Sequence, residues 1–266
     1  MDFIQIVILA IVQGTTEFLP ISSSGHLILA PHLFGFADQG LAFDVAVHLG
    51  SLIAVMSYFR RDIVSITIGW FGALPPSKPQ TQESRLGWSI IVGTIPIVLA
   101  GVAMKSLVEG DFRAPIVIAT TTIVFGLVLW WVDAKHKHTR NFEDITIKDA
   151  LFIGFAQVIA LIPGTSRSGI TMTAALMLGL SREASSRFSF LLAIPTILAS
   201  SIFVTKDLIE SPAPVDWTAL GLGVLLSGIT AYLAIMYFLR YIERIGMLPF
   251  VIYRLLLGIV ILAIVL

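Results

Sequence analysis

Long apolar stretches separated by short polar ones dominate the chain. Six of these stretches are long enough to cross a bilayer, because a helical crossing takes roughly 20 mostly apolar residues. They cover residues 42–59, 88–108, 114–132, 187–205, 217–239 and 248–266. The pattern therefore predicts an all-α polytopic membrane protein with six full transmembrane helices.

Two further regions are apolar but are interrupted by proline, glycine and hydroxyl residues. The interruptions carry related sequences, QGTTEFLPISSSG at 13–25 and QVIALIPGTSRSG at 157–169. An apolar half-helix, a turn and a second half-helix form a re-entrant hairpin, which is tolerated at membrane depth where protein or water satisfies the freed backbone groups. We therefore expect re-entrant helical hairpins at 1–36 and 149–180.

The two related cassettes indicate an internal duplication. Each half contains one hairpin and three crossings, and because three is odd, the second copy must be upside down relative to the first. This inverted-topology repeat predicts a first repeat at 1–133, a cytoplasmic linker at 134–148 and a second repeat at 149–266.

Charged loop residues predict the orientation. With this topology, 12 of the 17 Lys and Arg residues lie in loops on one face and three lie on the other. Because cytoplasmic loops are enriched in Lys and Arg, the first face is predicted to be cytoplasmic. Both termini and the first hairpin then lie on the outer side of the membrane.

Composition agrees with this class and excludes several kinds of chemistry. Hydrophobic residues make up 56% of the chain, the mean hydropathy is +0.92, and only 13% of residues are charged, against roughly 25% in a soluble domain. The zero formal net charge provides no field for nucleic acid, so we expect no nucleic-acid partner. The absence of cysteine excludes a thiolate nucleophile and a Cys-ligated metal centre.

The hydroxyl-rich turns are predicted to bind an anion. Each turn precedes an apolar run, so its hydroxyls and free N–H groups lie at the N-terminus of a half-helix, where the dipole favours negative charge. Arg167 adds a permanent charge with forked donors that suit phosphate. We expect the turns to face each other and bind a phosphate or diphosphate. The candidate substrate-binding residues are Ser22, Ser24, Gly25, Gly164, Thr165, Ser166, Ser168 and Gly169.

Glu17 is a candidate catalytic residue because a carboxylate in an apolar hairpin is costly and usually serves a function. Gln13 lies one turn earlier, so the oxygens of the two side chains share a helical face. Together they are predicted to hold a divalent cation, Mg²⁺ or Ca²⁺, which prefers oxygen ligands. In the alternative, Glu17 only pairs with Arg167 and joins the two hairpins.

Ser23 and His26 are the candidate nucleophiles. Histidine can act as a base toward serine or attack phosphorus itself. Ser23 is favoured among the three serines because Ser22 and Ser24 have counterparts in the second cassette and resemble caps. The residues leave the choice of nucleophile open, and in the structural alternative Ser23 is a simple cap and His26 is a core residue.

Three more polar residues fall within predicted spans. Asp44 and His48, four positions apart, predict a local side-chain pair, with a role in lining the approach to the site as the alternative. Arg254 lies about one and a half turns inside the last span and is predicted to extend to the cytoplasmic surface.

The motifs QGTTEFLPISSSGH at 13–26 and PGTSRSG at 163–169 resemble those of the bacterial undecaprenyl-diphosphate phosphatase family associated with bacitracin resistance. The resemblance covers nearly the whole chain. It implies an inner-membrane enzyme that recycles the cell-wall lipid carrier by hydrolysing undecaprenyl diphosphate, with a divalent cation and a site that opens outward. It assigns the site to Gln13, Glu17, Ser23, His26, Ser166 and Arg167. Many members carry Glu at the position of Gln13, so Glu17 is expected to provide the charge of any metal contact.

Two other functions share features with this sequence. The turn Ser24-Gly25-His26 also resembles the type-2 phosphatidic-acid phosphatases, but that class requires a histidine and an aspartate where this chain has Thr173 and Met177. An inverted repeat with broken helices is also a transporter architecture, so a transporter or flippase of a polyprenyl phosphate is the alternative. The sequence leaves the oligomeric state open, with a homodimer as one arrangement.

Overall fold

The computed structural model describes residues 1–27, 35–36, 39–74, 79–109, 112, 114–137, 139–209 and 216–265. Within these residues the named secondary-structure elements are all helices, joined by turns and loops. The helices are α1 (Phe3–Thr16), α3 (Gly40–Tyr58), α4 (Arg60–Gly72), α5 (Gln82–Ala103), α6 (Lys105–Glu109), α7 (Pro115–Lys135), α8 (Ile147–Val158), α9 (Arg167–Met177), α10 (Arg182–Ile209), α11 (Trp217–Ile245) and α12 (Leu248–Val265). Short 3-10 turns cover Phe142–Asp144 and Ile159–Leu161.

The prediction of six membrane spans is confirmed. Among the described residues, six helices are long and apolar enough to cross a membrane, namely α3, α5, α7, α10, α11 and α12. The start of α5 was predicted six residues too late and that of α10 five residues too late. Both helices begin with polar turns, and Thr81 caps α5 by accepting a hydrogen bond from the Ser84 N–H. Hydropathy does not detect such turns because their residues are polar, although several of them, including Ser84 and Ser185, are buried.

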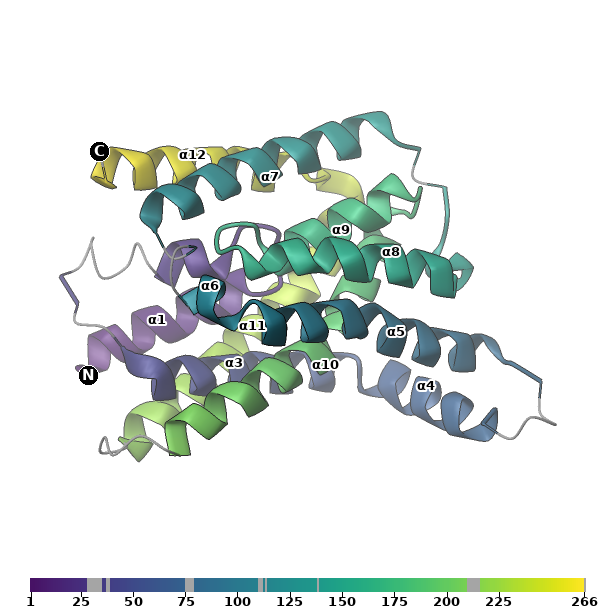
Figure 1. Ribbon diagram of the computed structural model, residues 1–266, viewed down its shortest axis with the longest axis horizontal. Coiled ribbons are helices and arrows are strands. Elements are labelled where there is room, and N and C mark those ends of the chain that lie inside the picture. The colour runs from purple at the N-terminus through teal and green to yellow at the C-terminus, as the bar shows by residue number, and fades with distance from the viewer. Residues whose placement is uncertain are drawn as a thin grey trace.

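The short helices α1, α8 and α9 lie among the long ones (Figure 1). In Figure 1, α7 and α12 run side by side along one edge, while α4 and α5 form a pair at another, and both chain ends lie at the same end of the bundle. The helices α1 and α3 pack against α11, and α8 packs against α5 and α9. The helices α1, α8 and α9 have 14, 12 and 11 residues, too few for a full crossing each.

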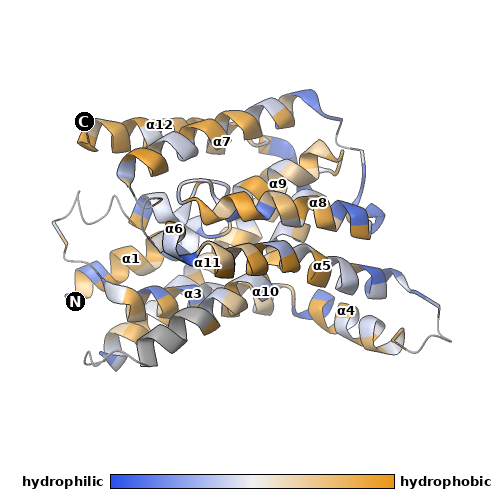
Figure 2. Cartoon of the chain, viewed as in Figure 1, coloured by the Kyte–Doolittle hydropathy of each residue, from blue (hydrophilic) through white to orange (hydrophobic). Residues whose placement is uncertain are grey.

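Hydrophobic and hydrophilic residues occupy different parts of the helix bundle. Figure 2 shows hydrophobic residues along most of α7, α12 and α5, while hydrophilic residues gather where α7 connects to α8 and near the start of α5. Many large apolar side chains point outward from the spans, including Leu99, Ile202 and Leu256. In a membrane protein this exposed apolar surface faces lipid.

Helix α1 approaches α11 closely enough to position the first cassette. A Cβ atom at Gly14 would overlap Thr230 Oγ1 and the carbonyl oxygen of Ser227. Small residues of this kind let helix backbones pack closely in a membrane, where packing rather than the hydrophobic effect drives association. The contact fixes the end of α1, one turn before the hydroxyl-rich loop.

The linker before the second cassette is anchored by an ion pair. Arg140 donates to both carboxylate oxygens of Asp149, at 3.3 and 2.6 Å, and to the carbonyl of Leu178. Burial raises the pKa of Asp149, but the hydrogen bonds from Arg140 and Thr146 outweigh it and hold the pKa below its usual range. The ionised carboxylate therefore ties the start of α8 to the end of α9.

Candidate active site

The first half of the site lies at the C-terminal end of α1. The backbone N–H of Glu17 donates to the carbonyl of Gln13 at 3.0 Å and ends the helix. The Gln13 side chain is fully buried, and the Glu17 side chain is only 8% exposed. A carboxylate buried to this degree requires partners that compensate its lost hydration.

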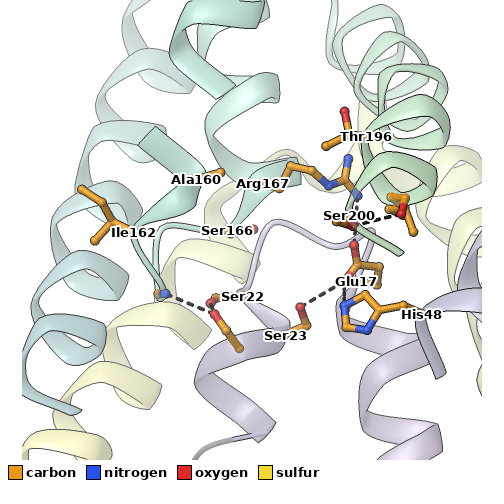
Figure 3. Close-up of a pocket in the computed structure, with 13 residues that line it drawn as sticks. Glu17, Ser22, Ser23, His48, Ala160, Ile162, Ser166, Arg167, Thr196 and Ser200 are labelled. Atoms are coloured by element: carbon orange, nitrogen blue, oxygen red, sulfur yellow. Dashed lines mark hydrogen bonds and ion pairs between the residues drawn. The ribbon is translucent and has the colours of Figure 1, made fainter. Parts of the chain in front are cut away.

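Four side chains supply those partners, and Arg167, Ser23 and His48 among them are drawn in Figure 3. Arg167 Nη2 lies 3.1 Å from Glu17 Oε1 and forms an ion pair with it. Gln13 Nε2 and Ser23 Oγ donate to Glu17 Oε2 at 3.0 and 3.1 Å, and His48 Nε2 lies 3.8 Å from the same oxygen. The structure thus joins Glu17 of the first cassette to Arg167 of the second.

The turns of the two cassettes share one local conformation. Ser22 and Ser166 both have left-handed backbone angles, with φ of 74° and 69°. The Ser22 hydroxyl accepts from the Gly25 N–H at 3.4 Å and lies 3.1 Å from Ser24 Oγ. Left-handed geometry is uncommon for a residue other than glycine, so its recurrence at matching positions indicates that the two turns have the same backbone structure.

The second turn repeats the same bonds. Ser166 Oγ accepts from the Gly169 N–H at 3.1 Å and lies 3.2 Å from Ser168 Oγ, and this bond caps the N-terminus of α9. The cap stabilises the first turn of α9, and Arg167 points from this turn toward Glu17.

The two turns also bind each other directly. The Gly164 N–H donates to Ser24 Oγ at 3.1 Å, and Ser168 Oγ donates to the carbonyl of Leu19 at 2.8 Å. As expected from the sequence, the two hydroxyl-rich turns meet, each at the N-terminal side of helical residues, where the backbone dipoles are positive.

A pocket of about 210 Å³ opens where the turns meet. Its lining comes from the two cassettes and from two long helices, α3 and α10. The lining residues are Glu17, Ser22, Ser23, Ser24, His48, Ala160, Ile162, Gly164, Ser166, Arg167, Thr196, Ile197 and Ser200. The wall mixes polar and apolar groups, and its apolar side chains are Ala160 and Ile162 of the second cassette and Ile197 of α10.

Six of the predicted site residues do not line this pocket, His26 among them. Gly25, Thr165, Ser168 and Gly169 lie beneath the turns, and Gln13 contacts the pocket only through Glu17. These buried residues shape the turns.

His26 lies on the other side of the first turn. Its Nδ1 is 2.7 Å from the carbonyl oxygen of Ser22, and its Nε2 is 2.6 Å from the hydroxyl of Tyr253. The ring stacks on Tyr253 with the centroids 5.4 Å apart. Because a carbonyl only accepts, Nδ1 carries the proton and Nε2 accepts from Tyr253.

His48 lines the pocket, a position that the sequence indicated only as the alternative to a local pair. The sequence predicted a pair with the Asp44 side chain, whereas Gln39 Nε2 donates to the Asp44 carboxylate and the ring Nδ1 of His48 binds the backbone carbonyl of Asp44 at 2.7 Å. This bond turns Nε2 toward Glu17. A histidine inside a predicted span is a functional candidate by default, and that signal was present in the sequence.

The prediction for Arg254 was wrong. Its side chain is fully buried and does not extend to a surface. The guanidinium donates to the carbonyls of Thr122, Gly164 and Thr165 at 3.0, 3.1 and 2.9 Å. Backbone carbonyls of the second cassette replace water as its partners, so the charge stays inside.

The residues around Glu17 fit a hard cation only in part. No group of three or more His, Asp or Glu side chains is placed to hold a metal within the described part of the chain. However, Gln13 Oε1 is buried and has no hydrogen-bond partner among the described residues. In this structure Gln13 presents Nε2 to Glu17, and a turn of the amide would bring Oε1 beside the carboxylate, which is a suitable pair of donors for Mg²⁺ or Ca²⁺ if a ligand supplies the remaining oxygens.

Comparison with known proteins identifies the family that the chain matches. The family described as "Bacitracin resistance protein BacA" matches residues 6–260. The chain is 58% identical over 265 residues to "Undecaprenyl-diphosphatase 2" of Stutzerimonas stutzeri, with 98% of each chain covered. It is 58% identical over 262 residues to "Undecaprenyl-diphosphatase" of Alteromonas mediterranea, again with 98% of each covered. The protein of that name from Teredinibacter turnerae is 56% identical over 259 residues, covering 97% of this chain and 98% of its own.

Proposed function

Since the chain belongs to the family of bacitracin resistance protein BacA, we propose that it is an undecaprenyl-diphosphatase. It hydrolyses undecaprenyl diphosphate to undecaprenyl phosphate and phosphate, and so recycles the lipid carrier of cell-wall synthesis. The observation that carries the proposal is the buried Glu17–Arg167 pair in a pocket walled by two hydroxyl-rich helix starts.

The pocket binds the diphosphate through its positive groups. Arg167 uses one Nη to bind Glu17, and its other Nη makes a single long bond of 3.5 Å to the Ser189 carbonyl, so it retains donors for phosphate oxygens. The dipoles and hydroxyls at the two helix starts add to this field. Ala160 and Ile162, the apolar lining residues of the second cassette, contact the first isoprene units of the substrate.

Ser23 is the nucleophile in this mechanism. Its Oγ lines the pocket and donates to Glu17 Oε2, which is placed to take the proton. Oγ attacks the terminal phosphorus, the bond from that phosphorus to the bridging oxygen breaks, and undecaprenyl phosphate leaves with that oxygen and with the proton from Glu17. Water then attacks the phosphoserine, returns a proton to Oγ and releases phosphate. Arg167 stabilises the charge on the transferred phosphoryl group in both steps.

A divalent cation fits beside Glu17 as part of this proposal. Glu17 and Gln13 would supply a carboxylate and an amide oxygen, and the diphosphate would supply the other ligands. When bound, the ion neutralises negative charge on the substrate.

We further propose that the two halves form an inverted-topology repeat. The repeats are 1–133 and 149–266, with re-entrant hairpins at 1–36 and 149–180. The matching bonds of Ser22 and Ser166 support this arrangement, as does the interruption of the second predicted hairpin into α8 and α9. The second arm of the first hairpin is predicted at about 26–36, and its residues 28–34 lie outside the described residues. The loop charges support an inner-membrane orientation with both termini and the site facing the periplasm.

The function is tested by phosphate release from undecaprenyl diphosphate by the detergent-purified protein, with and without excess chelator. We expect release by the wild type, its loss on chelation and its return with Mg²⁺ or Ca²⁺. Glu17→Ala should lower release at least about 10²-fold, since the carboxylate both orients Ser23 and accepts its proton. The control is Glu143→Ala, which removes an exposed carboxylate of the linker.

The negative outcomes separate the parts of the proposal. Release that persists in chelator would exclude the cation and leave the phosphatase. A folded wild type that releases no phosphate would overturn the enzyme and favour the transporter or flippase of a polyprenyl phosphate.

His26 has a different expected role, namely to hold the first turn in place. His26→Ala removes the bond to the Ser22 carbonyl and should lower kcat about 10- to 100-fold through misplacement of the turn. Tyr253→Phe removes one bond to the ring and should cost tenfold or less, about the value of a single hydrogen bond. Steady-state rates of both variants check the expectation. A phosphorylated His26 trapped during turnover would instead make His26 the nucleophile.

A further inference from the structure

Arg254 is a buried cation without a carboxylate partner. It lies in α12, with a fully buried side chain, and no ion pair joins it to an acidic residue within the described part of the chain. Charged groups inside membrane spans are costly and are retained where they serve a function. The mechanism above does not use this charge, so its position needs a separate reason.

The packing of α7 against α12 is shaped around this side chain. A Cβ at Gly126 of α7 would lie 3.3 Å from Arg254 Cβ and 3.5 Å from its Nε. Nε donates to the carbonyl of Thr122, one turn earlier on α7. The side chain therefore lies along α7 and reaches the second cassette at a defined height.

At its tip the guanidinium holds the backbone of the cassette. Nη2 donates to the carbonyls of Gly164 and Thr165, at 3.1 and 2.9 Å. The cassette is also bound to α7 through the hydroxyls of Thr121 and Thr122, which donate to the carbonyls of Pro163 and Gly164 at 2.6 and 3.2 Å. Arg254 thus completes a set of bonds that hold the turn against α7.

The same guanidinium lies beneath the first turn of α9. Nη1 is buried and has no hydrogen-bond partner among the described residues. It is so close to Gly169 that a Cβ there would lie 2.8 Å away. This contact explains why the last position of the cassette is glycine, and it places a positive charge directly under the turn that carries Arg167.

The turn needs such support because its backbone is strained. Gly164 and Ser166 have φ of +88° and +69°. A left-handed serine costs on the order of 1–2 kcal/mol and persists only where the surroundings enforce it. Without that enforcement, Ser166 would relax and carry Arg167 away from Glu17.

We propose that Arg254 is a positioning residue of the diphosphate site, holding the Gly164–Ser166 turn through its carbonyls so that Arg167 meets the transferred phosphoryl group. The inference rests on the proposed function. It adds a residue that lies 85 positions after the second motif in the chain and does not line the pocket.

The test measures kcat and KM for undecaprenyl diphosphate in Arg254→Met, Arg167→Ala and the double variant. Arg254→Met should lower kcat about 10²-fold with little change in KM, because a small misplacement of a group that acts in the transition state costs about that much. The double variant should be no slower than Arg167→Ala, since both changes remove the same contact. Arg244→Met, at an exposed position near the end of α11, is the matched control.

Arg254→Lys keeps the proposal testable if the methionine variant does not fold. Lysine retains the charge but lacks the fork, and should recover a folded protein with about a tenth of the activity. Wild-type activity in Arg254→Lys, or in Arg254→Met relative to its control, would overturn the inference while leaving the phosphatase in place. Losses that multiply in the double variant would also overturn it, because Arg254 would then act independently of Arg167. An inactive wild type would instead refute the proposed function itself.

Discussion

Replacing Arg167 by alanine is expected to lower kcat/KM for undecaprenyl diphosphate by about 10³-fold, as for other losses of a charge that stabilises a transition state. Arg167 is the forked cation of the pocket lining, and its side chain is 12% exposed, so little water can replace it. Phosphate release by the purified variant measures the effect. Arg167→Lys should recover only part of the activity, because an ammonium cannot bind Glu17 and phosphate in the same forked geometry.

A folded protein distinguishes this effect from a structural one. The variant should keep its thermal midpoint within a few degrees, because Glu17 retains Gln13, Ser23 and His48 as partners. The control is Arg61→Ala, an exposed arginine of α4. If Arg167→Ala turned over at the wild-type rate, the pocket described above would not be the site of phosphoryl transfer.

Replacing Gly164 by alanine is expected to destabilise the folded protein by several kcal/mol and to abolish activity. A Cβ there would overlap Thr121 Oγ1 and the carbonyl oxygen of Ile118, and the φ of +88° is unfavourable for any side chain. Overpacking and left-handed backbone together cost on the order of 2–5 kcal/mol. The measurement is the thermal midpoint and the monodisperse fraction in detergent.

Gly221→Ala is the control for this substitution. Gly221 lies in α11, and no atom lies within 4 Å of the position that a Cβ would take. Alanine there should be neutral or slightly stabilising, since it favours a helix. If Gly164→Ala were as stable as Gly221→Ala, the tight contact between the second turn and α7 would not exist in the protein.

The number of spans could be predicted because the signal is local. About 20 apolar residues in a row are sufficient to specify a crossing in any surroundings. The starts of α5 and α10 were missed because polar capping turns extend those helices beyond the apolar stretch. The meeting of Glu17 with Arg167 was also predictable, from a duplicated motif with one acidic and one basic copy.

The roles of three other polar residues depended on neighbours far away in the chain. His26 and His48 both lie in apolar segments, yet the first stacks on Tyr253 and the second points at Glu17. Arg254 is long enough to reach either a surface or the protein interior, and the sequence around it does not distinguish the two. The side chain lies in the interior because Gly126 leaves room for it and the carbonyls of Gly164 and Thr165 bind its guanidinium.

By itself, then, the sequence determined the membrane class, the six spans and the two cassettes, because lipid burial and turn chemistry act on consecutive residues. Only the tertiary structure decided which side chains of those segments face the pocket and which support it from beneath. The reason is that a polar group in a membrane protein must find its partner within the fold, and that partner lies 150 residues away for Glu17 and Arg167 and 227 residues away for His26 and Tyr253.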